Sequence, residues 1–122
     1  MRALVLGAGL LLAVAGHGAA QDTQTATGNG AVLRVLDKIN GEVQDITLPN
    51  GGAGAVWRIQ VELGECRYPA GNPAGDGIAF VTLRQEGQAD PLFRGWMFAS
   101  APALNALDHP RYDVWVIRCT TS

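Results

Sequence analysis

Residues 96–119, WMFASAPALNALDHPRYDVWVIRC, decide the fold of this 122-residue chain. Two tryptophans, one phenylalanine, one tyrosine, two prolines, one histidine and one of the two cysteines are concentrated in this stretch. Two apolar, strand-like runs enclose a segment rich in alanine and leucine, and the second run ends at Cys119. This density of large apolar side chains and rigid turn residues predicts a tightly specified β structure, and it contains no motif that by itself identifies a reaction.

The rest of the chain repeats the pattern of short apolar runs separated by glycine and proline turns. The clearest run is 57–63, where every second residue from Trp57 to Leu63 is apolar, which predicts a strand with one buried and one solvated face. Asn40-Gly41 lies between two such runs and favours a type I′ hairpin turn, because both residues tolerate a positive φ. These signals predict an all-β domain, a small sandwich or partly open barrel of about six short strands. The expected strands are 32–37, 43–48, 57–63, 78–84, 92–98 and 112–119.

The segment between the last two expected strands favours one or two helical turns. Alanine and leucine favour a helix, Pro102 is tolerated in a first turn, and Ser100 can cap the N-terminus. Pro110 would end such a helix. We therefore expect one short helical turn near 101–107.

The first twenty residues have the features of a secretory signal peptide. Met1-Arg2 supplies a basic start, residues 3–15 are apolar and uncharged, and Gly18-Ala19-Ala20 places small residues for cleavage after Ala20. A membrane-spanning helix needs roughly 20 apolar residues, so cleavage is favoured over retention of the segment as an anchor. The mature chain is expected to be a soluble exported protein with no membrane span.

Residues 21–30, QDTQTATGNG, contain no large apolar side chain and predict a flexible leader. The remaining residues, 31–122, are enough for one small domain. Its basic residues are spread singly along a chain of net charge −2. Neither nucleic-acid binding nor electrostatic docking to anionic lipid is expected, because both need clustered cations.

Cys66 and Cys119 are the two cysteines of the chain. In an exported domain, two cysteines most simply form one disulfide, which for so long a loop would stabilise the fold by about 4 kcal/mol. A redox-active pair is the alternative, but it normally requires the C-x-x-C spacing that these residues lack.

Catalytic and metal-binding patterns are weak. His109 is the one histidine beyond the signal segment, so neither a zinc site nor any other metal or cofactor site is expected. Ser100, His109 and either Asp108 or Asp113 supply the residue types of a catalytic triad. However, Ser100 lacks a G-x-S-x-G elbow, and Asp108-His109-Pro110 is typical of a turn. We therefore expect no catalytic residues.

The aromatic residues divide into two groups. Trp57, Phe80 and Trp115 follow strand patterns and are expected in the core. A second group lies around the expected helical turn, where aromatic rings next to arginines have the composition of a protein-binding hot spot. Core packing is the alternative for these rings, because a small domain needs its apolar surface inside first. This candidate interaction surface comprises Arg94, Trp96, Phe98, His109, Arg111 and Tyr112.

The chain resembles a family of small exported bacterial proteins, the domain of unknown function 2155. The resemblance rests on residues 95–110 and continues through 112–116 to Cys119. It is supported more weakly by 31–34, 36–38 and Gly41, and by Cys66. The chain departs from the family pattern at Ala101, where serine is expected, and at Val35, where glycine is expected. It implies a periplasmic β-rich domain with one disulfide and no established reaction. Family genes often lie beside the gene for an accessory subunit of respiratory complex I, which implies a peripheral subunit on the periplasmic side of this NADH:quinone oxidoreductase.

The sequence thus predicts a non-enzymatic periplasmic interaction or accessory domain with a protein partner, an inner-membrane respiratory complex being the candidate. The alternative is a small-ligand or glycan-binding module with an aromatic cleft near Trp96 and Tyr112. A hydrolase using Ser100 and His109 would need those two side chains to lie together.

Overall fold

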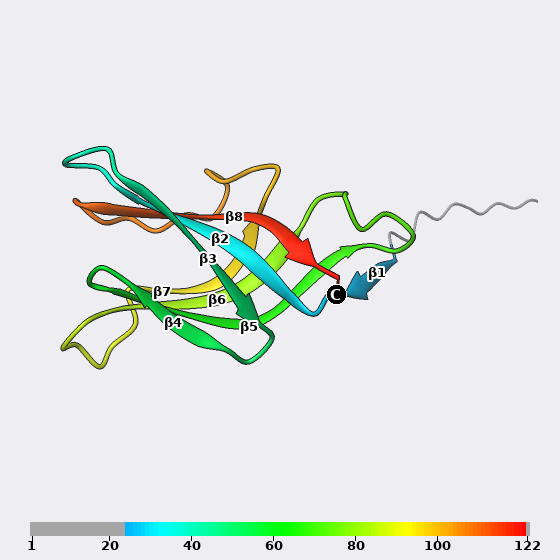
Figure 1. Cartoon of the computed structure of the whole chain (residues 1–122), viewed down its shortest axis with the longest axis horizontal. Coiled ribbons are helices and arrows are strands. Elements are labelled where there is room, and N and C mark those ends of the chain that lie inside the picture. The colour runs from blue at the N-terminus through cyan, green and yellow to red at the C-terminus, as the bar shows by residue number, and fades with distance from the viewer. Residues whose placement is uncertain (1–23, 122) are drawn as a thin grey trace, which may run out of the picture.

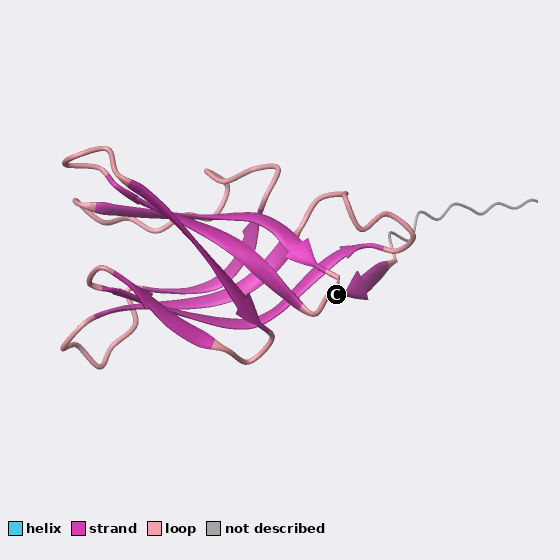
Figure 2. Cartoon of the chain, viewed as in Figure 1, coloured by secondary structure: helices cyan, strands magenta, loops and turns pink. Residues whose placement is uncertain are grey.

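The computed structural model describes residues 24–121, which form two antiparallel β-sheets packed face to face (Figure 1). Within this range the chain forms strands and loops and no helix (Figure 2). The expected signal peptide, 1–20, and the first residues of the expected leader, 21–23, lie outside the described residues. Accordingly, no helix between residues 24 and 121 is long and apolar enough to span a bilayer.

One sheet has the strand order β1-β5-β6-β7, with β4 also paired to β5, and the other has the order β3-β2-β8. The two layers are not closed into a barrel. Of the two forms that the sequence predicted, a sandwich or a partly open barrel, the fold is therefore the sandwich. The strands are β1 (Thr25–Thr27), β2 (Gly30–Asp37), β3 (Val43–Pro49), β4 (Ala53–Val56), β5 (Ile59–Pro69), β6 (Ile78–Gln85), β7 (Phe93–Phe98) and β8 (Tyr112–Thr120).

Two of these strands were not expected from the sequence. β4 forms a tight hairpin with β5, in which Val56 pairs with Ile59. β1 lies inside the segment 21–30 that we expected to be a flexible leader, and it pairs with the far end of β5. The Gly28 N–H donates to the Cys66 carbonyl at 2.7 Å, and the Asn29 N–H donates to the Thr120 carbonyl at 2.7 Å. Residues 25–30 are therefore part of the fold. Their composition does not predict a strand, but the exposed edge of β5 supplies hydrogen-bond partners for their backbone.

The core lies between the sheets and is built mainly from aliphatic side chains. Alternate residues of β5 and β6, from Ile59 to Leu63 and from Ala79 to Leu83, are almost completely buried. Leu33 and Val35 of β2 and Val114 of β8 face them from the other sheet. Each valine, leucine or isoleucine among them contributes roughly 1.5–3 kcal/mol when fully buried. The alternation predicted for 57–63 is confirmed from Ile59 onward.

The Cys66–Cys119 disulfide joins β5 of one sheet to β8 of the other, as expected from the sequence. The two Cα atoms are 5.5 Å apart and the residues are separated by 53 positions. Both cysteines are buried. The bond therefore ties the two layers together across the core.

The β2–β3 hairpin forms where Asn40-Gly41 predicted it, but its turn is longer. The Asp37 N–H donates to the Glu42 carbonyl at 2.8 Å, which leaves residues 38–41 as the loop. Gly41 alone has a positive φ, 79°, whereas a type I′ turn would need two such residues. The longer turn forms because the Asp37 carboxylate accepts a hydrogen bond from the Ile39 N–H at 3.0 Å.

Residues 99–111 connect β7 to β8, and the expected helical turn near 101–107 is a single hydrogen-bonded turn. The Leu104 N–H donates to the Ala101 carbonyl at 3.0 Å, and no helix continues from it. Two tertiary contacts draw this segment onto the sandwich: Leu107 is buried in the core, and the Asn105 side-chain amide donates to the Trp96 carbonyl at 2.8 Å. These contacts replace the backbone hydrogen bonds that a helix would have made.

Candidate interaction surfaces

An aromatic pair lies on the face of the β5-β6-β7 layer that points away from the core. Phe80 of β6 is paired with Trp96 of β7, while their neighbours Ala79, Val81 and Met97 point inward and are buried. The two rings meet edge to face, with centroids 5.2 Å apart and planes inclined by 69°. This is the favoured geometry for an aromatic pair. We call this region the Phe80–Trp96 face.

Two arginines cover the rings of the Phe80–Trp96 face. The Arg67 guanidinium carbon is 5.8 Å from the Trp96 centroid, and that of Arg94 is 5.5 Å from the Phe80 centroid. Each distance is within the range of a cation–π contact. Arg67 also donates to Glu65 at 2.6 Å, whereas Arg94 makes no ion pair with any residue from 24 to 121. A charged group on an aromatic surface is therefore left free to meet a ligand or partner.

A glycine makes room for this arrangement. Gly64 of β5 lies beside Phe80, and a Cβ atom placed there would be 3.3 Å from the Phe80 ring carbon Cδ1. The absence of a side chain lets the ring lie close to the β5 backbone, which is one use of a glycine inside a strand.

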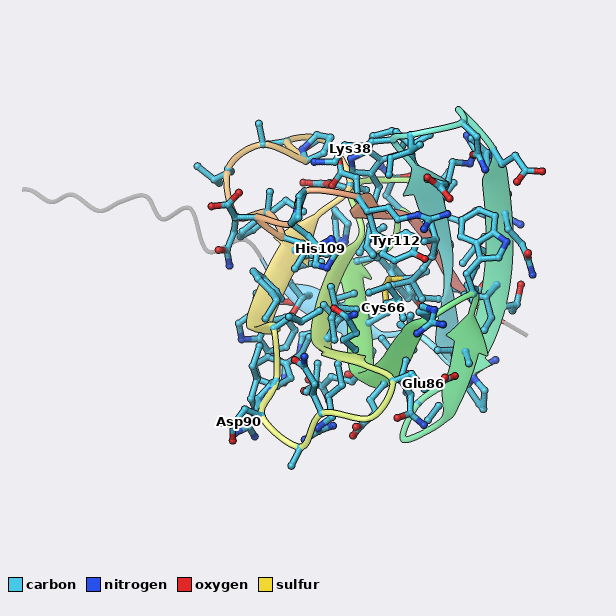
Figure 3. The ribbon with its side chains drawn as sticks, turned by 90° about the vertical axis from the view of Figure 1, so that its left-hand side faces the viewer. Lys38, Cys66, Glu86, Asp90, His109 and Tyr112 are labelled. Atoms are coloured by element: carbon cyan, nitrogen blue, oxygen red, sulfur yellow. A yellow bond between two sulfur atoms is a disulfide. The ribbon has the colours of Figure 1, made fainter. Side chains whose placement is uncertain are left out.

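The second aromatic region lies at the end of the sandwich where β2 ends and β8 begins, and we call it the Tyr112 end (Figure 3). Tyr112 stacks on Trp57, with centroids 6.1 Å apart and an interplanar angle of 15°. The Arg111 guanidinium carbon lies 5.3 Å from the Tyr112 centroid, and the His109 ring centre is 5.4 Å away. Tyr112 is consequently only 3% exposed.

An ion pair closes the Tyr112 end. Arg111 donates from Nε and Nη2 to Oδ2 of Asp37, at 3.1 and 2.9 Å. The Asp37 side chain is only 3% exposed, whereas that of Arg111 is 45% exposed. The hydrogen bonds from Arg111 hold the pKa of the Asp37 carboxyl below its usual value and raise the pKa of Arg111. The pair joins the start of the β2–β3 turn to the start of β8.

His109 orders the chain immediately before β8. Its Nδ1 atom accepts hydrogen bonds from the backbone N–H groups of Arg111, at 3.0 Å, and Tyr112, at 3.2 Å. The ring hydrogen must therefore be on Nε2, which lies 3.2 Å from Oε1 of Gln85. His109 thus links the two layers at this end and fixes the direction in which β8 begins.

The six residues predicted as one interaction surface are therefore divided between two places. Arg94 and Trp96 belong to the Phe80–Trp96 face, and Phe98 extends it, because it is paired with Ile78 farther along the same two strands. The other three, His109, Arg111 and Tyr112, form the Tyr112 end.

Four aromatic residues differ in burial from the group to which the sequence assigned them. Tyr112 was assigned to the candidate interaction surface, but it points inward from β8 and is buried, as the core-packing alternative predicts. Trp57 was expected in the core; it lies in the turn between β4 and β5 and is 37% exposed. Phe80 and Trp115 were also expected in the core, but both are only partly buried, since each points outward from its sheet. β6 and β8 form where the sequence predicted strands, but Phe80 and Trp115 are on the faces of these strands that point away from the core.

The triad residues are not brought together. The Ser100 hydroxyl donates to Asp76 at 2.7 Å, just before β6 begins, whereas His109 contacts Gln85, at the end of β6. The length of β6 separates them by roughly 23 Å, at about 3.3 Å per residue. Ser100, which we expected to cap a helix, instead anchors the loop after β7 to the loop before β6.

The surface of the described residues has two notable hollows. One, of about 140 Å³, lies between the β4–β5 turn and the β6–β7 loop, and is lined in part by Trp57, Arg58 and Glu86. The other, of about 370 Å³, lies between Trp115 and the turn at 102–107 and is mainly apolar. Neither hollow is lined by Trp96 or Tyr112, where the sequence placed a glycan cleft. In residues 24–121, no three His, Cys, Asp or Glu side chains are grouped closely enough to hold a metal ion.

These features define a disulfide-linked, two-sheet β-sandwich with an aromatic region on one face and another at one end. The chain belongs to the family described as "Uncharacterized protein conserved in bacteria" (DUF2155), whose model matches residues 31–119. It is 28% identical over 94 residues to "Uncharacterized protein RP359" of Rickettsia prowazekii (strain Madrid E). That match includes 75% of this chain but only 60% of the relative's length. No solved structure matches the fold significantly.

Proposed function

We propose that the protein is a non-enzymatic interaction domain that binds a protein partner in the periplasm through the Phe80–Trp96 face. The observation that supports this proposal is the pair of arginines lying over two outward-facing aromatic rings. Tryptophan and arginine are the residues most enriched among those that dominate binding energy at protein interfaces.

The geometry of the face favours binding because its parts are already ordered. Phe80 and Trp96 are held by paired strands and by their contact with each other. Fewer side-chain rotations are then lost when a partner docks, so more of the contact energy appears as affinity. Partial burial of both rings leaves apolar area that a partner can cover.

The charge of the face indicates what the partner should offer. Arg94 is exposed and has no carboxylate partner among residues 24–121. A partner that brings a carboxylate to Arg94 and an apolar side chain to Trp96 would satisfy both groups, and a guanidinium-carboxylate pair is a strong hydrogen-bonded contact. We therefore propose a partner surface that combines acidic and apolar residues.

The proposed partner is respiratory complex I, with this protein as a peripheral subunit on its periplasmic side. The signal-like sequence of residues 1–20 supports export. Complex I itself is suggested by the gene neighbourhood of the family, which is an association and not a contact.

Affinity purification from mildly solubilised inner membranes tests the proposal. The tagged wild-type protein should recover NADH:quinone oxidoreductase activity together with subunits of that complex, and Arg94→Ala and Trp96→Ala should each reduce that recovery. Lys38→Ala, at the exposed β2–β3 turn, is the matched control and should recover as much as wild type.

Two results would reject separate parts of the proposal. Recovery of the wild-type protein as a free monomer would remove complex I as the partner. Equal recovery by wild type and Trp96→Ala would remove the Phe80–Trp96 face as the binding surface.

A further inference from the structure

The hollow beside Trp57 combines an aromatic ring with polar side chains that make no hydrogen bond or ion pair in the described part of the chain. It lies where the β4–β5 turn meets the β6–β7 loop, and its volume of about 140 Å³ is equivalent to on the order of five water molecules. Ala55 and Ile59 supply apolar walls, and Gln60 and Glu86 supply polar ones. The site is distinct from the Phe80–Trp96 face.

Trp57 is held in an unusual backbone conformation. It occupies a two-residue turn, with Val56 and Ile59 paired on either side, and its φ is 53°. It is the only residue other than glycine with a positive φ between positions 24 and 121. A bulky side chain rarely adopts this conformation, and such residues are concentrated at functional sites.

The Trp57 ring is also fixed in space and yet accessible. Stacking on Tyr112 restrains it from one side, and 37% of the residue remains exposed. Tyr112 is itself held by Arg111 and His109. The indole is thus a rigid platform, supported from behind by the whole Tyr112 end.

The polar residues around the Trp57 ring are held in place through their backbone, while the ends of their side chains are available to bind a ligand. The Glu86 N–H donates to the Arg58 carbonyl at 2.8 Å, which joins the two loops. Within residues 24–121, the side chains of Arg58, Gln60 and Glu86 make no hydrogen bond or ion pair. Figure 3 shows Glu86 at the front of this end, on the side facing the viewer.

We propose that this hollow binds a single ring of a neutral sugar. The apolar face of a pyranose would lie on the Trp57 indole, and its hydroxyl groups would bond to the other lining residues. Glu86 accepts from hydroxyls, Arg58 donates to them, and the Gln60 amide can do both. The positive and negative charges of Arg58 and Glu86 cancel, which favours a neutral ligand with several hydroxyl groups over a phosphate or another anion.

The size of the hollow sets the expected strength of binding. It is smaller than the pockets that enclose drug-sized ligands, so one sugar ring would remain partly exposed. A dissociation constant on the order of 1 mM is expected for a monosaccharide. Longer saccharides with the same terminal ring should bind with similar or modestly greater affinity.

Nuclear magnetic resonance of the ¹⁵N-labelled protein tests the proposal, with glucose, galactose, mannose and N-acetylglucosamine as separate probes. At least one sugar should shift the Trp57 indole N–H signal in a saturable way and leave that of Trp96 in place. Trp57→Ala should abolish the saturable shifts at Arg58 and Glu86. Trp96→Ala, on the other aromatic region, is the matched control and should bind as wild type.

Two further variants keep the test decisive if Trp57→Ala does not fold. Arg58→Ala and Glu86→Gln change exposed side chains that make no hydrogen bond or ion pair within residues 24–121. Each should weaken binding by roughly tenfold, the loss expected for one charge-assisted hydrogen bond. The proposal is overturned if none of the four sugars shifts the Trp57 signal, or if both variants bind as tightly as wild type. The sugar-binding test is independent of the proposed function: failure to recover a protein partner through the Phe80–Trp96 face would not change the result expected with the sugars.

Discussion

The two aromatic regions contain the same kinds of residue and use them in opposite ways. At the Phe80–Trp96 face, the rings point away from the core and arginines lie over them on the solvent side. At the Tyr112 end, the ring points inward and is enclosed by Trp57, Arg111 and His109. The difference comes from strand parity, since successive side chains of a strand alternate between the two faces. An aromatic-arginine pair can therefore stabilise a fold or offer a surface, and its place in the strand decides which.

The disulfide supports both regions, so its removal should have the largest effect without distinguishing them. Replacing Cys66 and Cys119 together by alanine should lower the free energy of unfolding by about 4 kcal/mol. Urea denaturation followed by tryptophan fluorescence measures this loss. A change below about 1 kcal/mol would mean that the link between the layers contributes little beyond the packing around it.

The comparison itself is tested by removing one ring from each region. Tyr112→Ala should lower the free energy of unfolding by about 3 kcal/mol, because it leaves a cavity between Trp57 and the core. Trp96→Ala should cost only about 1 kcal/mol, since its ring is open to solvent on one side. The same denaturation measurement compares them. Equal losses would show that the Phe80–Trp96 face is as structural as the Tyr112 end.

The Tyr112 end should also make stability depend on pH. The pKa values of Asp37 and Asp45 are both held below their usual 3.8, by Arg111 and Arg34 respectively. Below that pH the unfolded chain takes up protons that the folded chain does not, so stability is full above the usual carboxyl range and falls as the pH passes below 3.8. Melting temperature recorded against pH measures this.

Asp37→Asn separates the contribution of the Tyr112 end. It should lower the melting temperature at neutral pH by several degrees, because Arg111 loses its negatively charged partner and one amide oxygen cannot accept from both Ile39 and Arg111. It should also flatten the fall in acid, leaving the part due to Asp45 and its 2.7 Å contact with Arg34. An unchanged acid profile would mean that other carboxylates dominate.

The smallest expected effect on stability belongs to the exposed arginine of the Phe80–Trp96 face. Arg94→Ala should change the free energy of unfolding by no more than about 0.5 kcal/mol, as is usual for surface positions. The same variant should nevertheless reduce recovery of the partner. A substantial loss of stability would indicate that Arg94 holds Phe80 in place and is not primarily a binding group.

The strands with large alternating side chains could be predicted, and the short ones could not. Ile59 to Leu63 alternate clearly, and the sandwich follows from six such runs. β1 and β4 consist of threonine, alanine, glycine and a single valine, so neither has an apolar pattern of its own. They are strands because β5 is eleven residues long and has an edge that needs partners along its whole length.

The candidate sites were predicted in composition and only partly in position. The sequence indicated Arg94 and Trp96 but could not separate them from Tyr112, since they share one stretch of chain. The sequence also predicted that a strand begins at Trp57, but the chain turns at this residue and β5 begins at Ile59. The contact between Asp37 and Arg111 joins residues 74 positions apart, so no local pattern could reveal it. Gln60 and Glu86 were missed for the same reason.

The hydrogen bond between the Asn29 N–H and the Thr120 carbonyl has a practical consequence. It places the start of β2 and the end of β8 together, at the opposite end of both strands from Tyr112 (Figure 1). The described segment, residues 24–121, thus begins and ends at the same end of the sandwich. A linker fused directly to either end of this segment would leave Trp57, which stacks on Tyr112 at the opposite end, facing the bulk solution. Surface-based measurements of sugar binding require this orientation.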